Sequence, residues 1–572
     1  MRADRPRREG GLPAGLSVRG LTTSATVVAL LVFTGCSDGS QAHPPDTRGS
    51  DARSPDAQSP AAQSPDGRGG QGSGSGRTAS APKPAFPAAP RTIPSVRAFA
   101  PAPADTWSGG AEWRPAAGTR VIADPDGPLA DEARLLAKEL DAGHAAGPAE
   151  RGDVQLAIDP GRSGGREAYE LTVRDGTVRI TGSDQAGVFY GTRTVLQAVR
   201  ADGKLRAGTI RDRPDRPQRG LSLDIARKHF TAGWIEARVR EMADLKLNQL
   251  QLHFSDDQGF RLESSSHPEI VSEQHLSKAE LRRIVSLARG LHIAVIPEID
   301  SPGHLGAVIR AHPRLQLKNT SGSAVRGAVD IARPEAARIV DDLLREYAPL
   351  FPGLPGQEAY GHLGGDEYQA LTVKNPEASF PRLAAAARAK YGPKAKVQDL
   401  ATGWLNDRSD VLRKLDRRPK AWNDGFFRGG VVAAHRDREV EYWTGKELGA
   451  REPQEYLREG RKVVNLNDAY LYYVLGEPNT FRYPTGERIY RQWTPAVLRG
   501  SKPVPASMAG PDRVLGGRFA VWCDIAGAQT QDQVTRGIRM PLRALAQKLW
   551  EPGEPALSWS EFTGLARATE RG

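Results

Sequence analysis

Runs of alternating apolar and polar residues are interleaved, along most of this chain, with segments whose apolar residues recur every three or four positions. In the first such region the alternating runs lie at residues 154–158, 169–174 and 178–182, and the helical spacing lies at residues 129–140 and 186–199. Alternation is typical of half-buried strands and the longer spacing of amphipathic helices. The pattern predicts a small α+β domain at residues 98–213, ended by the charged, proline-rich segment 211–217. We expect this domain to pack against the next one.

From residue 214 onward the two patterns alternate regularly, one strand and then one helix. Eight apolar runs are expected to be strands, at residues 221–226, 249–254, 293–298, around 361, 420–422, 439–443, 462–466 and 518–522. Helical spacing between them is clearest at residues 234–245, 278–289 and 334–347. Eight parallel strands with intervening helices predict an α/β fold, a (β/α)₈ TIM barrel, at residues 214–572. The alternative is a doubly wound open sheet, but no glycine-rich phosphate loop follows the first strand.

The start of the chain has the pattern of an export signal. An arginine-rich beginning at residues 5–8 precedes an apolar run of about ten residues, which ends in residues 29–36 and is too short to span a bilayer. Cys36 follows a small residue, as in the lipobox of bacterial lipoproteins, although Phe33 stands where leucine is usual. We therefore expect residues 1–36 to be a lipoprotein-type signal peptide, with Cys36 lipidated and the protein anchored extracellularly to the outer face of the membrane. The alternative is ordinary secretion with an incidental cysteine.

Composition and charge change this picture in three places. Residues 37–97 consist mostly of Ser, Pro, Gly, Gln and Asp, so they cannot bury enough apolar surface to fold and are expected to be a disordered linker. Cys523 is the one other cysteine of the sequence, so no structural disulfide is expected. The net charge of +11 comes from dispersed arginine rather than a basic block interleaved with aromatics, which argues against nucleic-acid binding.

The candidate chemistry centres on residues 359–368, where an apolar run meets two glycines and then two adjacent acids, Asp366 and Glu367. Consecutive strand residues point to opposite faces, so these carboxylates are poorly placed to flank one bond as a nucleophile and an acid. A break at Gly364 and Gly365 would relax that alternation and let both acids reach one ligand. One acid could then protonate a leaving group while the other holds a different part of the substrate. The alternative is a solvated acidic turn.

Catalytic groups of such barrels come from the carboxyl ends of several strands. Here those ends supply Arg227, Asp256, Asp257, Asp300, His304, Asp366, Glu367, Trp422, Trp443, Asp468, Tyr470, Trp522 and Asp524. Taken singly, each residue has a structural alternative. Each tryptophan could belong to the hydrophobic core, His304 could stabilise a turn, and Arg227 or Asp256 could form a structural ion pair. Together they indicate a carbohydrate pocket, because aromatic faces stack on sugars and Asp and Arg bind paired hydroxyls. A carboxylic acid in such a pocket is a natural proton donor to a glycosidic oxygen.

Four motifs in this order resemble family 20 glycoside hydrolases, the β-N-acetylhexosaminidases. They are Leu223-Asp224-Ile225-Ala226-Arg227, His253-Phe254-Ser255-Asp256-Asp257-Gln258-Gly259-Phe260-Arg261, Pro297-Glu298-Ile299-Asp300-Ser301-Pro302-Gly303-His304 and His362-Leu363-Gly364-Gly365-Asp366-Glu367. The resemblance extends from about residue 105 to the C-terminus, since the α+β domain also looks like the N-terminal domain of that family.

The resemblance implies a retaining, substrate-assisted mechanism in which the 2-acetamido oxygen of the sugar attacks C1 and forms an oxazolinium ion. Glu367 would protonate the leaving oxygen and later activate water. Asp366 would accept the acetamido N–H and stabilise the developing positive charge. We expect the neighbouring anion to raise the pKa of Glu367 as well. Neither adjacent carboxylate then has to be the nucleophile.

The resemblance also assigns the supporting residues. Asp256 and His304 would form a relay to Glu367, and Arg227 would bind hydroxyls of the terminal sugar. The acetamido pocket would be walled by Trp422, Trp443 and Trp522, with the hydroxyl of Tyr470 directed at the carbonyl oxygen. No cofactor is implied, and no metal is expected because the acids and histidines lack ligand spacing.

Two positions depart from the pattern of many exo-acting members. Tyr472 stands where an aspartate follows the pocket tyrosine by two residues, and Asp524 replaces the glutamate of Trp-x-Glu. Both positions help to hold the O4 and O6 hydroxyls of a terminal sugar, and both look more like the lacto-N-biosidase branch, which releases a disaccharide.

On the four motifs as a whole, the sequence favours an exo-acting β-N-acetylhexosaminidase acting on chitin fragments or glycans. The alternatives are a lacto-N-biosidase-like enzyme and a non-catalytic, lipid-anchored sugar-binding protein. The expected partners are a carbohydrate and, through the anchor alone, a membrane.

Overall fold

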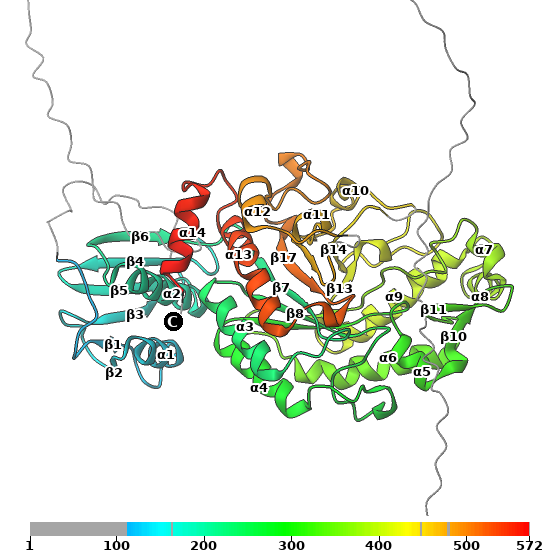
Figure 1. The fold of residues 1–572 in the computed structure, drawn as a ribbon, viewed down its shortest axis with the longest axis horizontal. Helices are drawn as coiled ribbons and strands as arrows, with labels where there is room; N and C mark the ends of the chain where they lie inside the picture. The colour runs from blue at the N-terminus through cyan, green and yellow to red at the C-terminus, as the bar shows by residue number, and fades with distance from the viewer. Residues whose placement is uncertain (1–110, 162–163, 447–448, 478–480, 571–572) are drawn as a thin grey trace, which may run out of the picture. The chain divides into compact units, whose positions relative to one another are not determined.

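The structure is a computed structural model, and it describes residues 111–161, 164–446, 449–477 and 481–570 (Figure 1). All of these residues fall in one of two compact units, residues 84–572. The predicted signal peptide with Cys36, and the predicted linker, lie outside the described residues. No helix in the described ranges is both long enough and apolar enough to cross a membrane.

The N-terminal part is a six-stranded mixed sheet with two helices packed on it. Its elements are β1 (Arg120–Ile122), α1 (Ala130–Leu140), β2 (Gly143–Ala145), β3 (Val154–Ile158), β4 (Tyr169–Arg174), β5 (Thr177–Gly182), α2 (Gln185–Asp202) and β6 (Gly208–Asp212). The strand order is β2-β1-β3-β5-β4-β6, in which β4 is antiparallel to both of its neighbours. In β4 burial alternates residue by residue, so its apolar residues meet the helices. The α+β prediction for this region agrees with these elements.

Buried polar contacts join this N-terminal part to the barrel. Arg219 donates to Glu167 at 2.8 Å, and Trp550 donates its indole N–H to Asp212 at 2.8 Å. Lys246 donates to Thr194 at 2.7 Å, and burial lowers the pKa of this lysine to about 8. The N-terminal part thus contacts the barrel through buried polar groups, as expected from the sequence.

Eight of the remaining strands close into a parallel barrel, while β10 (Gln316–Lys318) and β11 (Ala324–Val329) pair as a separate antiparallel hairpin. The strands of the barrel are β7 (Gln218–Asp224), β8 (Gln249–Ser255), β9 (Ala294–Ile299), β12 (Ala359–His362), β13 (Arg417–Trp422), β14 (Glu439–Tyr442), β15 (Val463–Asn465) and β17 (Val514–Trp522). They pair in the order β15-β14-β13-β12-β9-β8-β7-β17, and pairing of β15 with β17 completes the ring. The predicted (β/α)₈ barrel is confirmed, and closure rules out the open sheet.

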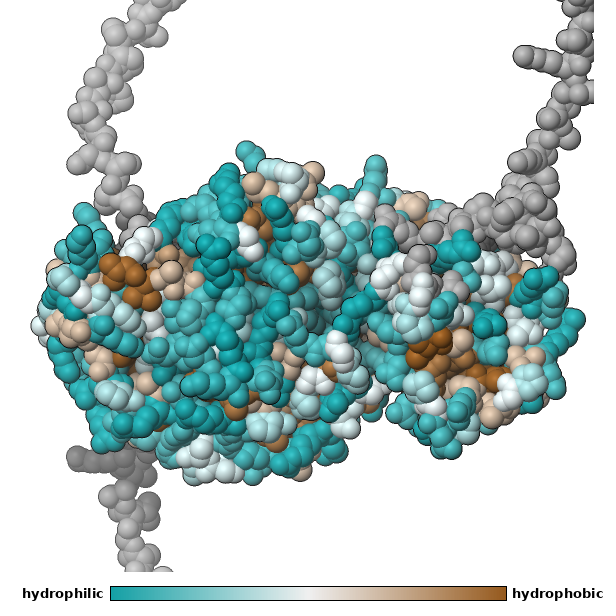
Figure 2. Space-filling view, turned by 180° about the vertical axis from the view of Figure 1, so that it is seen from behind, coloured by the Kyte–Doolittle hydropathy of each residue, from teal (hydrophilic) through white to brown (hydrophobic). Residues whose placement is uncertain are grey.

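Helices surround the barrel on its outside (Figure 1). They include α3 (Ala232–Asp244), α4 (Lys278–Gly290), α6 (Pro334–Tyr347), α8 (Pro381–Tyr391), α9 (Val397–Lys414), α10 (Pro453–Arg458), α12 (Gly486–Gln492), α13 (Gln531–Trp550) and α14 (Trp559–Ala568). Local sequence fixes where several begin: Ser277 and Glu280 cap α4 reciprocally, and Thr530 caps α13. The face in Figure 2 is mainly hydrophilic, as expected when the apolar stripes of the helices turn inward.

The seventh barrel strand is interrupted, which the sequence analysis did not anticipate. After β15 ends at Asn465, the chain forms the single-turn helix α11 (Asp468–Leu471) and then resumes as β16 (Tyr472–Val474). Strand β16 pairs with the far end of β17, so Tyr472 lies beside Ala520 and Val474 beside Trp522. The carboxyl end of this strand position is therefore Tyr472–Val474, beyond the residues that a continuous strand would place there.

Candidate active site

The two adjacent acids follow β12 through a tight glycine turn. Gly364 and Gly365 have φ values of +67° and +94°, a region that residues with a side chain rarely adopt. A Cβ atom at Gly364 would lie 1.7 Å from Asp300 Oδ1, so no larger residue fits there. The backbone N–H of Gly365 donates to the same Asp300 oxygen at 3.0 Å. The turn thus breaks the strand alternation and sends Asp366 and Glu367 toward one cavity.

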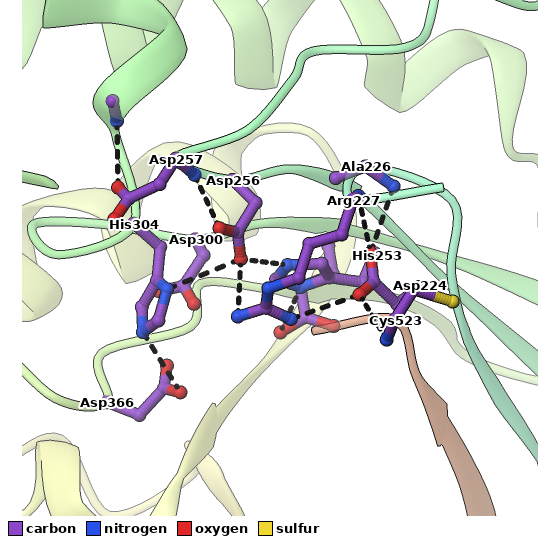
Figure 3. Close-up of polar contacts among 12 residues, drawn as sticks. Asp224, Ala226, Arg227, His253, Asp256, Asp257, Asp300, His304, Asp366 and Cys523 are labelled. Carbon is purple, nitrogen blue, oxygen red and sulfur yellow. Dashed lines mark hydrogen bonds and ion pairs between the residues drawn. The ribbon is translucent and has the colours of Figure 1, made fainter. Parts of the chain in front are cut away.

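His304 lies between Asp256 and Asp366 (Figure 3), and it is also close to Glu367. Its Nδ1 is 3.3 Å from Asp256 Oδ2, and its Nε2 is 3.4 Å from Glu367 Oε2. The same Nε2 is 3.6 Å from Asp366 Oδ2. These separations are longer than good hydrogen bonds, which is common in catalytic sites without ligand. The arrangement brings together the four residues that the sequence analysis assigned to catalysis.

Negative charge around His304 sets its protonation state. Burial alone would disfavour the imidazolium, but Asp366, Asp300 and Asp256 raise the pKa of His304 well above its ordinary value. Asp256 shows the opposite shift: although its burial raises the pKa, His304 and Arg227 hold the pKa of Asp256 well below its ordinary value. His304 therefore carries a proton that it can share with either neighbouring carboxylate.

The pKa of Glu367 differs from the prediction. The contact with His304 lowers the pKa of Glu367 below its ordinary value, and burial opposes this only in part. The expectation that Asp366 raises the proton affinity of Glu367 is therefore wrong for the site without ligand. The imidazolium, which the sequence analysis placed in the relay without assigning it a charge, outweighs the neighbouring anion because it touches Glu367 directly.

Asp300 and Asp366 form a buried pair of acids. Burial and the charge of Asp366 raise the pKa of Asp300 well above its ordinary value. Burial also raises the pKa of Asp366, against the effect of His304. Because two neighbouring buried carboxylates do not both ionise readily, these raised pKa values favour one proton on the pair. One of the two is then available as a hydrogen-bond acceptor toward the cavity.

A small aromatic pocket of about 100 Å³ adjoins these acids. It is lined by Arg227, His304, Asp366, Glu367, Trp443, Tyr472, Val474, Phe481, Trp522 and Asp524. Trp443 stacks on Tyr472 with ring centroids 5.6 Å apart and planes 2° apart. Trp422 is buried beneath Trp522, with centroids 5.9 Å apart, and its indole N–H donates to Glu298 at 2.7 Å. The three predicted tryptophans therefore gather at one recess, two in its wall and one beneath it.

The tyrosine of this pocket is Tyr472 and not Tyr470. Tyr470 belongs to α11, is 3% exposed, and packs under Arg488 at 4.2 Å from the ring centroid. Helix α11 displaces the end of the strand by two residues, which brings Tyr472 and Val474 to the cavity. The assignment of Tyr470 is corrected accordingly, and Asp468 instead pairs with Lys446 at 2.7 Å. The position two residues after the pocket tyrosine is then Val474, which cannot accept a hydrogen bond from a hydroxyl.

Arg227 and Asp524 lie where this pocket opens into a second cavity. Arg227 pairs with Asp256 at 2.8 Å and Asp224 at 3.0 Å, and its Nε is 4.0 Å from Asp524. Beyond them is a polar cavity of about 320 Å³, lined by Arg227, Asp256, Asp257, Gln258, His304, Arg326, Glu367, Gln369 and Asp524. Because the two cavities share four of their lining residues, a bound sugar in the pocket could extend into the polar one.

Two further residues, Glu298 and Asp424, support the site without having been assigned roles from the sequence. Glu298 receives the Trp422 indole and also lies 3.3 Å from both His253 and His362. Asp424 accepts the backbone N–H of Glu367 at 2.9 Å and the indole N–H of Trp443 at 3.1 Å. Glu298 belongs to a quoted motif and Asp424 follows Trp422 by two residues, so position along the strand was an available signal for both.

Ligating atoms of Asp300, His304 and Asp366 lie within 4.8 Å of one another, as do those of His253, Glu298 and Asp300. Such sets could hold a cation. Here, however, the same side chains form the proton-sharing network described above.

Comparisons with known proteins agree with this geometry. A family model described as "Glycosyl hydrolase family 20, catalytic domain" matches residues 217–553, and one described as "Glycosyl hydrolase family 20, domain 2" matches residues 97–213. A beta-N-acetylhexosaminidase of Cellulomonas fimi is 31% identical over 444 residues, which cover 72% of this chain and 79% of that protein.

A lacto-N-biosidase of Bifidobacterium bifidum is 28% identical over 494 residues, which cover 84% of this chain but only 42% of that protein. The chain thus spans less than half the length of that relative. Among solved structures, a chitobiase of Flavobacterium johnsoniae has a TM-score of 0.66 at 20% identity, covering 83% of this chain and 71% of that one. At that identity the likeness concerns the fold. Since the catalytic-domain model alone matches more than half of the sequence, the chain belongs to glycosyl hydrolase family 20 and is a glycoside hydrolase.

Proposed function

We propose that this chain is an exo-acting β-N-acetylhexosaminidase that removes terminal N-acetylhexosamine (GlcNAc or GalNAc) from chitooligosaccharides or glycans by a retaining, substrate-assisted mechanism. One observation carries the proposal: Asp366 and Glu367 face the same recess, which is walled by Trp443 and Trp522 and is about 100 Å³ in volume. A recess of this size and apolar character suits an acetamido group beside a sugar ring.

Asp366 is placed to hold the acetamido N–H of the sugar. With one proton on the pair of Asp300 and Asp366, a carboxylate oxygen of Asp366 can accept a hydrogen bond from the acetamido N–H. The remaining negative charge of the pair would stabilise the oxazolinium ion. In the same recess, the hydroxyl of Tyr472 would donate to the acetamido oxygen and fix it beneath C1. The amide of the substrate would then be held in the geometry of attack.

Glu367 would act as the acid with a proton supplied by His304. In the site without ligand the proton resides on the imidazole, because three carboxylates surround it. Transfer from Nε2 to Glu367 Oε2, 3.4 Å away, gives the neutral acid that protonates the leaving oxygen. Ionised Glu367 would later take a proton from the attacking water. Asp256, held ionised by Arg227, would keep the imidazole oriented throughout.

A second candidate, release of a disaccharide by a lacto-N-biosidase-like activity, has its own support. Val474 cannot bind a sugar hydroxyl, and the recess opens past Asp524 into the polar cavity of about 320 Å³. A second sugar ring could occupy that cavity. The similarity to a lacto-N-biosidase over 84% of this chain points in the same direction.

Two chromogenic substrates separate the candidates. The 4-nitrophenyl glycosides of GlcNAc and of lacto-N-biose would be compared by kcat/KM with the same purified protein. The exo-acting proposal predicts the larger value for the monosaccharide. Absence of monosaccharide hydrolysis together with release of the disaccharide would establish the second candidate instead. Binding of both sugars without hydrolysis of either would indicate a sugar-binding protein.

We also propose that the enzyme is exported and anchored to the outer face of the membrane through a lipid on Cys36. The arginine-rich start, short apolar run and small residue before Cys36 support this. Metabolic labelling with a fatty-acid analogue should mark the wild type and not a Cys36→Ala variant. Release of the wild-type protein into the medium without label would contradict the proposal.

A further inference from the structure

Two histidines and one glutamate converge on the surface away from the sugar pocket. His267 Nδ1 lies 3.1 Å from Glu269 Oε1, and His312 Nε2 lies 2.9 Å from the same oxygen. The three ligating atoms lie within 4.8 Å of one another. His312 is 43 residues from Glu269, so spacing along the chain gave no sign of this set.

Two of the three separations within the set are close to those of a zinc site. Zinc binds imidazole nitrogen and carboxylate oxygen at about 2.0–2.2 Å, so ligating atoms around a tetrahedral ion lie about 3.3 Å apart. The two nitrogen-to-oxygen separations here are close to that value. Two imidazoles with one carboxylate form a donor set suited to zinc, whereas calcium and magnesium prefer oxygen ligands alone. The side chain of Glu269 is 41% exposed, which leaves water room to complete the coordination.

A fourth residue strengthens this interpretation. The second ring nitrogen of His267, Nε2, is buried and makes no hydrogen bond, and it points toward Asp342 Oδ2 at 3.6 Å. Metal-bound histidines regularly direct their other ring nitrogen at a carboxylate, which fixes the tautomer. With metal bound, a proton on Nε2 facing Asp342 would leave Nδ1 of His267 free of its proton and directed at the proposed ion.

We propose that His267, Glu269 and His312 bind one zinc ion, with Asp342 orienting His267 from behind. The ion would have a structural role, since none of these residues lines the sugar pocket. Without metal, the two imidazoles can each donate an N–H to Glu269, which gives the same distances. Metal binding and this hydrogen-bonded triad therefore have to be distinguished by experiment.

The position of the site indicates what the ion would stabilise. His267 and Glu269 belong to the loop after β8, at the short helix η2 (Pro268–Ile270), and that loop begins at Asp256. His312 follows α5 (Gly306–Ala311), which starts two residues after His304. The same two loops are already joined by the Gly306 N–H, which donates to Asp257 at 3.1 Å. Zinc would fasten together the two loops that carry the relay residues Asp256 and His304.

Zinc titration of the full chain, purified without a histidine tag and stripped with chelator, tests the proposal. Wild type should bind one ion per chain at this site, and His312→Gln should weaken that binding by at least tenfold. Asp342→Asn should weaken it by about tenfold, as removal of an orienting carboxylate does. His435→Gln, which alters a partly exposed histidine elsewhere, should bind like wild type.

His304→Gln separates this site from the active site. If zinc is retained by His304→Gln and lost by His312→Gln, the ion binds where we propose. Loss of zinc in the first variant with retention in the second would overturn the proposal, as would equal binding by wild type and His312→Gln. Glu269→Gln provides a second variant should His312→Gln fold poorly, and circular dichroism monitors folding. Added zinc should raise the Tm of wild type but not that of Glu269→Gln, and equal shifts would contradict the assignment.

Discussion

Two groups of ionisable side chains lie at different depths of the same barrel, and they differ in their balance of acidic and basic groups. The interior layer consists of Lys420, Arg518, Glu439 and Glu441, all buried on the strands. Lys420 lies 2.6 Å from Glu439 and 3.4 Å from Glu441, while Arg518 pairs with Glu441. Two cations therefore meet two carboxylates, and each charge has an opposite neighbour.

The rim layer, at the carboxyl ends of the strands, has an excess of acid. Its carboxylates are Asp256, Asp300, Asp366 and Glu367, and its cations are Arg227 and His304. These four acids, together with Asp224 and Asp524 beside Arg227, outnumber the two bases, so the pKa values of His304 and Asp300 are both raised.

The difference shows how one fold separates structural from chemical charge. In the interior layer a displaced proton would leave a buried charge unpaired, so protonation states stay fixed. In the rim layer the excess of acid leaves protons to be shared, which is the condition for acid and base catalysis. Glu298 lies between the layers and holds both Trp422 and His253, so the pocket wall and the relay rest on one carboxylate.

The largest effect is expected at the rim for Glu367→Gln. This change should lower kcat for substrates with poor leaving groups by about 10²–10⁴-fold, because general acid catalysis is lost. Inhibitor binding and Tm should stay near wild type, since the Glu367 side chain is half exposed and its buried neighbour His304 keeps two other carboxylates, Asp256 and Asp366, beside it. Steady-state kinetics and thermal unfolding measure both quantities. Glu273→Gln, at an exposed surface position, is the matched control, and unchanged kcat in Glu367→Gln would remove its role as the acid.

A substitution in the interior layer should instead lower the stability of the protein. Lys420→Met leaves Glu439 and Glu441 short of a cation, so the free energy of unfolding should fall by about 3–5 kcal/mol. Adding Glu439→Gln to this variant should recover part of the loss, because the uncompensated charge is then removed. Chemical denaturation measures both. If Lys420→Met has the same free energy of unfolding as wild type, the balance of charge in this layer does not contribute to stability.

A pair of tyrosines two positions apart sharpens the assignment of the pocket. Tyr472→Phe should lower kcat/KM by about 10- to 100-fold, since a hydrogen bond to a group that becomes charged contributes about 1.5–3 kcal/mol. Tyr470→Phe should have little effect on kcat/KM, because Tyr470 packs under Arg488 and not in the recess. The reverse ranking of the two variants would restore Tyr470 as the pocket tyrosine.

The smallest effect is expected for Asp300→Asn and appears as a pH dependence. The folded protein holds a proton on Asp300 above the ordinary aspartate pKa of 3.8, whereas the unfolded chain releases it. Stability contributed by this group therefore falls as the pH rises from about 4 toward the raised pKa. Asparagine does not titrate, so the stability of Asp300→Asn does not fall with pH for this reason. The free energy of unfolding of the variant should therefore increase relative to that of wild type as the pH rises. Denaturation curves at several pH values measure the difference, and a constant difference would show that the pair shares no proton.

Much of the fold could be predicted from the sequence because its signals are local. The apolar runs of the eight strands and the glycine turn before Asp366 depend on residues that are neighbours in the chain. The motifs also placed Asp256, His304 and Glu367 in one network, since carboxyl ends of parallel strands meet at one rim. The barrel and its rim followed from periodicity and strand order, whereas the network of Asp256, His304 and Glu367 followed from the resemblance to family 20 glycoside hydrolases.

What the sequence did not reveal depends on contacts between distant segments. The single turn of α11 shifts the strand end by two residues, and nothing near Tyr470 distinguishes it from Tyr472 in pattern. The direction of the pKa shift of Glu367 depends on the proton of His304, which in turn depends on three carboxylates from other strands. The cluster of His267 and His312 likewise forms only when two loops meet.

Inhibition by N-acetylglucosamine-thiazoline, a stable mimic of the oxazolinium ion, tests most directly whether the amide of the sugar performs the attack. The compound should inhibit wild type competitively, and far more tightly than N-acetylglucosamine itself does. Asp366→Asn should lose most of that preference, because the charge that stabilises the cyclic cation is removed. Equal inhibition by the thiazoline and by N-acetylglucosamine in wild type would contradict substrate assistance.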